Sequence, residues 1–219
     1  MKKKIKSFYV AVDGSSASGK TTASKIISKE FNLKLLSSGK LYRYIAYKII
    51  KNKNKYNKNI IKNFSKSISE KKLNSKKLYN QNVTNLSSMI AKKKYIRNYL
   101  KNYQIDFIKK NKFVIIEGRD IASKILPNAD LKLFFRCSIR KKALRRFEEF
   151  KKNNSSIKIK EVEKALKLRD FSDKNRKESP LLFVKGAVLV DTTNLTIHQM
   201  RVRLVKLVSK RIKKKYGNL

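Results

Sequence analysis

Apolar positions along the chain follow two patterns, short continuous runs and longer stretches in which they recur every three or four residues. The continuous runs cover residues 8–12, 33–36, 113–117, 131–137 and 187–190, and runs of this length are typical of buried strands. The stretches between them have the spacing of helices that bury one face. Strands that alternate with helices predict an α/β fold, with a parallel five-stranded sheet flanked by helices on both faces.

The helical spacing also predicts where most of the helices lie. We expect them at residues 20–31, 41–49, 84–110, 139–150, 162–168 and 197–212. A charged loop is expected after residue 168. Residues 51–82 are the most polar part of the chain and show only one short helical pattern, so we interpret them as an inserted, mobile segment. The 219 residues suit a single domain, 1–219, that contains this excursion.

The chain has one cysteine, Cys137, and one histidine, His198. A single cysteine excludes an internal disulfide and fits a reducing compartment, and a single histidine argues against a His/Cys metal site. No apolar run approaches the roughly 20 residues that a membrane-spanning helix needs. We therefore expect a cytoplasmic protein with no membrane partner, in which Cys137 packs within a strand and His198 lies on the surface.

Basic residues dominate the charge, because 57 Lys and Arg stand against 15 Asp and Glu, a formal net charge of +42. Such a balance is compatible with nucleic acid or another polyanion as partner. The lysines, however, are spread along the whole chain and mixed with asparagines, which is the pattern of a biased composition rather than of one basic stripe. We expect no nucleic-acid partner, although the charge should attract small anionic substrates at low salt.

Residues 14–21 match the phosphate-binding motif G-x-x-x-x-G-K-[ST] at every position, directly after a predicted strand and at the start of a predicted helix. In this motif, glycines let successive backbone N–H groups converge on phosphate oxygens, and the lysine reaches the β- and γ-phosphates. A serine-rich turn that merely caps a helix is the alternative. The expected ATP-binding residues are Gly14, Ser15, Ser16, Ala17, Ser18, Gly19, Lys20, Thr21 and Thr22, with Lys20 also catalytic.

Two carboxylates at predicted strand ends flank this loop, Asp13 and Glu117. We expect Mg²⁺ to be bound by the hydroxyl of Thr21, with Asp13 or Glu117 acting through water. The loop by itself predicts only a nucleoside-triphosphate binder, since GTPases, transport ATPases and small-molecule kinases all have it. The short chain favours a small-molecule kinase.

Further segments narrow the class. They are, in chain order, Leu-Leu-Ser-Ser-Gly-Lys-Leu-Tyr-Arg at 35–43, Glu-Gly-Arg-Asp-Ile at 117–121, Pro-Asn-Ala-Asp at 127–130, Leu-Arg-Asp-Phe-Ser-Asp-Lys-Asn-Arg at 168–176 and Val-Asp-Thr-Thr-Asn-Leu-Thr-Ile at 190–197. With them the chain resembles the bacterial cytidylate kinases, P-loop nucleoside monophosphate kinases, over nearly its whole length outside residues 51–82. The resemblance implies ATP-dependent phosphorylation of CMP and dCMP on an adenylate-kinase-like core. It also implies an acceptor-binding insert, here shortened, at 51–82 and a lid at 138–160.

The resemblance places the acceptor phosphate among Arg43, Arg119 and Arg176. Arginine presents a planar fork of donors that matches phosphate oxygens and stays charged. Three such forks can hold a dianion and orient one of its oxygens in line with the γ-phosphorus, which makes Arg119 and Arg176 catalytic as well. Any one of them taken alone could instead be a surface arginine, because charged residues are mostly exposed.

Base recognition maps by the same resemblance to Ser88, Arg97 and Asp120. A carboxylate that faces the exocyclic amino group of cytosine, and an arginine that faces its acceptors, are complementary to that base. Uracil would set an acceptor against Asp120, and an unpaired polar site rejects the wrong base. Asp120 could instead cap a helix. Ser88 and Arg97 are expected on one helix, nine residues apart, so their shared target rests on the resemblance alone.

The ribose maps to Arg169 and Asp173, although residues four apart on a helix can equally form an ordinary salt bridge. Ser38 and Tyr42 are expected to line the nucleoside pocket, with a competing core role for Tyr42. The arginine-rich helix at 139–150 resembles the lid of the family. Its arginines, of which Arg145 is the expected catalytic one beside Arg140 and Arg146, would close on the ATP phosphates and exclude water.

Two alternatives stay open. One is a P-loop kinase for another nucleotide or small metabolite, such as UMP or dTMP. The chain departs from the family pattern at Ser37, where the family usually has Asp, and at Ala122-Ser123, which replaces its usual Gly-Thr. The stretch between Arg43 and Asn85 is also short for the family, and this departure bears on how CMP is separated from dCMP or UMP. The other is a polyanion-binding protein that uses ATP structurally. Arginines gather in the motifs while lysines are scattered, which favours catalysis over the second alternative. We expect the enzyme to be a monomer.

Overall fold

The computed structural model describes residues 7–151 and 158–217. The chain divides into two compact units, one formed by Met1–Leu36 with Lys112–Leu219 and the other by Ser37–Asn111. Each unit has its own buried apolar residues, and the two are described separately below. No helix within the described ranges combines the length and the hydropathy that crossing a membrane requires.

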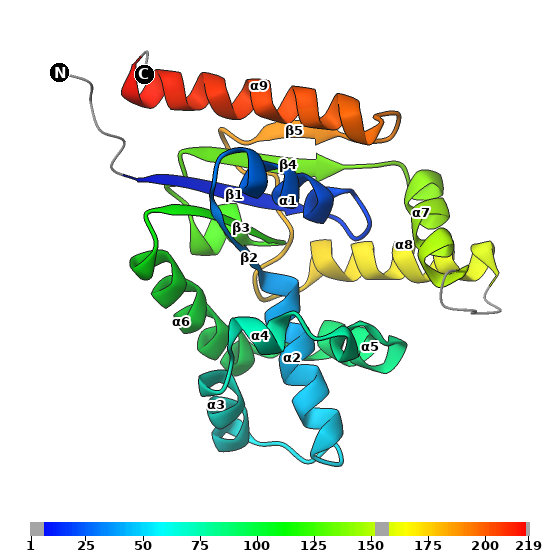
Figure 1. The fold of residues 1–219 in the computed structure, drawn as a ribbon. Coiled ribbons are helices and arrows are strands. Elements are labelled where there is room, and N and C mark those ends of the chain that lie inside the picture. Colours follow the sequence, from blue (N-terminus) through cyan, green and yellow to red (C-terminus); the bar gives the residue numbers. More distant parts are fainter. Residues whose placement is uncertain (1–6, 152–157, 218–219) are drawn as a thin grey trace. The chain divides into compact units, whose positions relative to one another are not determined.

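The first unit is built on a five-stranded sheet with the strand order β2-β3-β1-β4-β5 (Figure 1). The strands are β1 (Phe8–Gly14), β2 (Lys34–Ser37), β3 (Phe113–Gly118), β4 (Leu131–Arg136) and β5 (Val188–Asp191). β1 pairs in parallel with β3 and β4, and β4 with β5. Since β1 and β3 are neighbours, the loops that follow them meet at one edge of the sheet. The expected α/β fold and parallel five-stranded sheet are confirmed.

The described residues of this unit also form the helices α1 (Lys20–Glu30), α7 (Ile139–Lys151), α8 (Ile159–Asn175) and α9 (Ile197–Tyr216) and the short turn η2 (Ile121–Ile125). The helices α1 and α9 bury Ile27 and Leu204 in the same core as the inner strands. A smaller cluster joins α7 and α8 through Ala143, Val162 and Leu166. The first cluster therefore holds α1, which begins at the loop after β1, against the sheet. The second holds α7 and α8, the two helices that carry arginines expected at the site, against each other.

The second unit is entirely helical within Ser37–Asn111. Its elements are α2 (Ser38–Lys51), α3 (Lys58–Lys66), α4 (Glu70–Leu73), η1 (Lys76–Tyr79), α5 (Gln81–Ile90) and α6 (Lys94–Lys110). Buried residues from all of them, among them Ile45, Ile61, Leu73, Leu78 and Leu100, give this unit a core of its own. Three short helical elements thus occupy residues 51–82, where the sequence pattern shows one.

Two helix predictions were wrong. The single helix expected at 84–110 is two helices, because the chain leaves the helical path after Ile90 and re-enters it at Lys94. At this break Arg97 Nη1 donates to the carbonyl oxygen of Ala91 at 2.9 Å, which satisfies a backbone acceptor at the end of α5. Ser88 and Arg97 therefore lie on different helices, α5 and α6. The charged loop expected after residue 168 is instead the second half of α8, which continues to Asn175.

Candidate active site

The phosphate loop joins β1 to α1 in a conformation that depends on its glycines. Gly14 has φ 154°, and a Cβ atom there would lie 2.5 Å from the carbonyl oxygen of Phe135, so only glycine fits. Gly19 caps α1 in the left-handed region with φ 83°. Inside the loop, the hydroxyl of Ser18 donates to the carbonyl oxygen of Ser15 at 2.9 Å. This is the strand–loop–helix geometry that can present backbone N–H groups to an anion.

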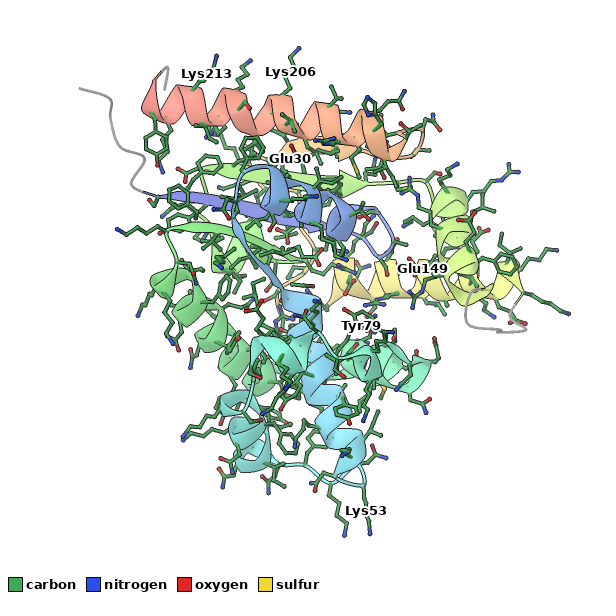
Figure 2. The ribbon with its side chains drawn as sticks, viewed as in Figure 1. Glu30, Lys53, Tyr79, Glu149, Lys206 and Lys213 are labelled. Carbon is green, nitrogen blue, oxygen red and sulfur yellow. The ribbon has the colours of Figure 1, made fainter. Side chains whose placement is uncertain are left out.

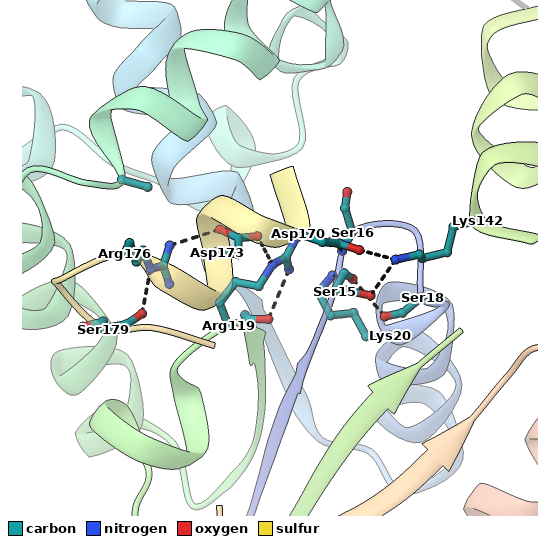
Figure 3. A network of polar contacts seen from close by, with 12 residues as sticks. Ser15, Ser16, Ser18, Lys20, Arg119, Lys142, Asp170, Asp173, Arg176 and Ser179 are labelled. Carbon is teal, nitrogen blue, oxygen red and sulfur yellow. Dashed lines mark hydrogen bonds and ion pairs between the residues drawn. The ribbon is translucent and has the colours of Figure 1, made fainter. Parts of the chain in front are cut away.

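Lys20, the first residue of α1, is only 8% exposed, and its Nζ donates to the carbonyl oxygen of Ser15 at 3.0 Å (Figure 3). Burial, together with the charge of Arg119, lowers the pKa of its amine to about 7, and the charge of Glu117 opposes this shift. An anion bound beside this buried amine would favour its charged form over its neutral form. The side chain is therefore suited to a phosphate group at the loop.

The two carboxylates beside the loop have different partners. Glu117 Oε2 accepts a hydrogen bond from the Thr21 hydroxyl at 2.7 Å. Asp13 instead accepts the backbone N–H groups of Ile121 and Ala122, at 2.9 and 2.7 Å, one on each carboxylate oxygen. Burial raises the pKa of Asp13 to about 6, against the lowering effect of these two N–H groups. Of the two expected magnesium partners, Glu117 lies with Thr21, whereas Asp13 anchors the turn after β3.

That turn carries Arg119 and Asp120 at the carboxyl end of β3. Arg119 Nε donates to Asp173 Oδ2 at 2.7 Å, and Arg176 Nη1 donates to Asp173 Oδ1 at 3.3 Å. Asp173, on α8, thus bridges two of the three arginines expected to bind the acceptor phosphate (Figure 3). Burial raises the pKa of Asp173, but the charges of Arg119, Arg176 and Arg169 outweigh it and hold that pKa below its usual value.

Asp120 occupies the N-cap position of η2, as its alternative role predicts, but its side chain makes no capping hydrogen bond to that turn. Asp120 is buried.

Asp173 forms salt bridges with Arg119 and Arg176, so the role of this carboxylate is not limited to an ordinary salt bridge between residues four apart on α8. Arg176 also donates to the carbonyl oxygen of Ser179 at 2.7 Å, which fixes the guanidinium beside the end of α8.

Among the arginines of α7, Arg145 reaches the phosphate loop. Its guanidinium donates to Thr192 Oγ1 at 3.1 Å and to the Thr192 carbonyl oxygen at 2.8 Å. Nη1 would lie 3.7 Å from a Cβ atom at Gly19. Arg140 is exposed, and Arg146 pairs with Glu149 at 2.5 Å on its own helix. The expected position of Arg145 beside the phosphate loop is therefore supported by its contacts with Thr192. Part of the expected lid, residues 152–157, lies outside the described residues.

In the second unit, Arg43 donates from Nη1 to the carbonyl oxygen of Leu78 at 3.0 Å and to Thr84 Oγ1 at 2.7 Å. The guanidinium carbon of Arg97 lies 5.5 Å from the centroid of the Tyr42 ring, which is a cation–π contact. Tyr42 therefore contacts a charged side chain, and its surroundings are not purely apolar.

Three more of the predicted residues are Ser38, Ser88 and Thr22. Ser38 is buried in its unit and accepts a hydrogen bond from Gln104 at 3.1 Å. Ser88 is half-buried on α5. Thr22, in the first turn of α1, is exposed.

Two charged residues of the site were missed by the sequence reasoning, Lys142 and Asp170. Lys142, on α7, is 4% exposed and contacts Asp170 Oδ2 on α8, and Asp170 Oδ1 accepts the loop N–H of Ser16 at 3.3 Å. Lys142 Nζ also lies 3.4 Å from Ser15 Oγ. Asp170 stands in the quoted segment 168–176, so it could have been noticed. Lys142 is one of many lysines, and its position in the chain carried no signal.

Comparison with known proteins gives the family. The family model for cytidylate kinase matches residues 10–210 of the chain. The chain is 36% identical over 216 residues to the cytidylate kinase of Fusobacterium nucleatum subsp. nucleatum, which covers 94% of this chain and 97% of that protein. It is 34% identical over 213 residues to the cytidylate kinase of Phytoplasma mali, covering 88% of this chain and 90% of that protein.

Among solved structures, an uncharacterized protein from Eubacterium ventriosum is similar with a TM-score of 0.53, over 92% of this chain and 98% of that chain. The two sequences are 14% identical, so this likeness concerns the fold alone. The sequence matches extend across both units and include the phosphate loop, the arginine-bearing turn after β3 and α8. The resemblance inferred from the sequence segments is confirmed, and the chain belongs to the cytidylate kinase family.

Proposed function

We propose that the chain transfers the γ-phosphoryl group of ATP to the phosphate of CMP, and of dCMP, giving the diphosphate and ADP. The observation that carries this proposal is the arrangement in the first unit, where a phosphate loop with a buried Lys20 lies beside a pair of arginines joined by Asp173. A cradle for one phosphate chain next to two guanidinium groups suits a reaction between two phosphates. The names of the relatives supply the identity of the acceptor.

The chemistry needs positioning and charge neutralisation more than it needs a base. The acceptor is a phosphate oxygen, which is already a nucleophile, and transferred phosphoryl groups are stabilised mainly by fixed positive charge. Lys20 would bind the β- and γ-phosphates, and Arg145 would neutralise charge that develops during transfer. Arg119 and Arg176, together with Arg43, would hold the acceptor phosphate and orient one oxygen for in-line attack.

Magnesium fits the residues beside the loop. The Thr21 hydroxyl and the Glu117 carboxylate, 2.7 Å apart, are the hard oxygen donors that Mg²⁺ prefers. Bound there, the ion would neutralise charge on the β- and γ-phosphates of ATP. The Asp13 carboxylate already accepts two backbone N–H groups, whereas Glu117 contacts Thr21 directly, so we assign the magnesium site to Thr21 and Glu117.

For the nucleoside, Asp120 with Ser88 and Arg97 would read the base, Arg169 and Asp173 the ribose, and Ser38 and Tyr42 would line the pocket. A buried carboxylate that accepts from the cytosine amino group would face the O4 acceptor of uracil. This sets the expected preference for CMP over UMP. The single cysteine fits a reducing compartment, and we propose the cytoplasm as the place of the reaction.

The test is an ADP-release assay with ATP and a panel of CMP, dCMP, UMP, dTMP and AMP. We expect the highest kcat/KM for CMP, with UMP at least roughly tenfold lower, as one unpaired buried polar group costs about 1–3 kcal/mol. The variant Asp120→Asn should narrow the gap between CMP and UMP. Equal turnover of all five nucleotides would remove the role given to Asp120. A kcat/KM that is highest with UMP or dTMP would favour the alternative of a P-loop kinase for another nucleotide.

A further inference from the structure

Thr192 occupies a fixed position next to the phosphate loop. It follows β5 directly, and its backbone N–H donates to the carbonyl oxygen of Arg136 at 2.9 Å, which extends the pairing of β4 with β5 by one residue. The residue is 1% exposed. A Cβ atom at Gly19 would lie 3.6 Å from both Oγ1 and Cγ2 of Thr192, so the side chain packs against the turn that begins α1.

The hydroxyl of Thr192 connects the loop to α7. Oγ1 donates to the carbonyl oxygen of Ser18 at 3.0 Å and accepts from Nη1 of Arg145 at 3.1 Å. A hydroxyl has one proton and two acceptor lone pairs, so it can make both contacts at once. The Thr192 carbonyl oxygen accepts the other Nη group of Arg145 at 2.8 Å. One residue therefore holds both ends of the guanidinium fork while it contacts the loop.

We propose that Thr192 is a positioning residue for ATP, which acts by holding the Arg145 guanidinium at the phosphate loop. An arginine side chain carries about 2 kcal/mol of rotamer entropy, so a partner that fixes it in advance strengthens its contact with a phosphate. A guanidinium has five N–H groups, and within the described residues three contacts of Arg145 go to Thr192 and Cys137, which leaves donors for a phosphate. The inference rests on the proposed function, in which Arg145 neutralises the transferred group.

The first experiment removes the hydroxyl at nearly constant size. Thr192→Val is expected to lower kcat/KM for ATP about tenfold, the scale of one hydrogen bond to a charged group, with the KM for CMP changed less than about twofold. Thr192→Ser, which keeps the hydroxyl, should recover most of the loss. Thr193→Val is the matched control, because that hydroxyl bonds to Asp191 and to the Ser138 N–H instead of the loop. The proposal would be overturned if Thr192→Ser lowered kcat/KM for ATP as much as Thr192→Val does, or if Thr192→Val changed the KM for CMP as much as it changes kcat/KM for ATP.

The second experiment tests whether Thr192 acts through Arg145. In an Arg145→Ala background, Thr192→Val should cost less than about twofold, since the partner is already absent. A full tenfold cost there would show that the hydroxyl acts only on the loop, against the proposal. If Thr192→Val does not fold, Arg145→Lys removes the two-ended contact from the other side, and wild-type kcat/KM for ATP in that variant would overturn the proposal.

Calorimetric binding of ATP to the same variants separates this inference from the proposed function. A wild-type chain that binds ATP without phosphorylating CMP contradicts the proposed function. The positioning role is then judged by affinity alone, with about tenfold weaker ATP binding expected for Thr192→Val and unchanged binding counting against it.

Discussion

Lys20 is the residue whose ionisation should respond most to the substrate. Its pKa of about 7 in the folded chain means that the amine is mostly neutral at pH 8, and a phosphate placed beside it favours the charged form. ATP binding should therefore take up close to one proton at pH 8 and much less at pH 6, where the amine is already protonated. Calorimetry in two buffers of different ionisation enthalpy measures this uptake.

The control for that measurement is Lys20→Met, which keeps the length of the side chain and removes the titrating group. Proton uptake at pH 8 should vanish in this variant, and kcat should fall by about 10²–10³, the scale for loss of one transition-state donor. Uptake that is the same in both proteins would mean that another group titrates and that Lys20 is charged before ATP arrives.

Substitutions of Asp13 and Glu117 should have different effects, the first on the free energy of unfolding and the second on the Mg²⁺ dependence of activity. Asp13→Asn sets an amide N–H against one of the backbone N–H groups of Ile121 and Ala122, and an unsatisfied buried group costs about 1–3 kcal/mol of unfolding free energy. Urea unfolding should show this loss, while the Mg²⁺ concentration for half-maximal activity stays the same. Glu117→Gln should raise that Mg²⁺ concentration. The reverse pattern would return the magnesium role to Asp13.

At the scale of elements, Asp173 links α8 to the turn after β3. Asp173→Asn weakens the ion pairs with Arg119 and Arg176, so kcat/KM should fall about ten- to a hundredfold, the range for hydrogen bonds to charged groups. We expect the same loss for CMP and dCMP in steady-state assays. Glu163→Gln is the matched control on the same helix, because among the described residues the ion pair of Glu163 is a local one, with Lys167. A loss confined to CMP would mean that Asp173 serves only the ribose 2′-hydroxyl and does not position the two arginines.

The elements whose positions follow from the sequence are those that bury apolar side chains. β1 and β3 have continuous apolar runs because they lie inside the sheet, and the loop after β1 has a motif whose chemistry is local. The second half of α8 has no such signal. Phe171 there is 68% exposed, and this part of the helix is fixed by ion pairs of Asp170 and Asp173 with residues on other elements. Periodicity of apolar residues cannot detect a helix face that is held by charges.

The candidate site divides in the same way. Lys20, Thr21 and Glu117 follow from a motif, whereas the anchoring role of Asp13 depends on two backbone N–H groups more than 100 positions away in the chain. Lys142 could not be told apart from the other lysines until the fold buried it beside Asp170. Long-range pairing of single polar atoms leaves no pattern in one sequence, and this is the part that only coordinates reveal.

At the scale of the whole molecule, the net charge of +42 should shape both stability and substrate capture. Lysines such as Lys53, Lys206 and Lys213 are exposed and extend away from the backbone (Figure 2), so the charge is spread over the surface rather than concentrated at the site. Raising ionic strength to about 0.15 M, where the Debye length is about 8 Å, should raise Tm by screening self-repulsion and raise the KM for both nucleotides. A Tm that does not change with salt would mean that the charges are already compensated.

The central claim is that a phosphoryl group passes from ATP to the phosphate of CMP. Phosphorus NMR of the chain with ATP, Mg²⁺ and CMP follows every phosphorus atom of the reaction directly. We predict that CDP and ADP accumulate in equal amounts without inorganic phosphate, and that both accumulate about 10²–10³-fold more slowly with Lys20→Met. Accumulation of ADP and inorganic phosphate, with CMP unchanged, would contradict the account.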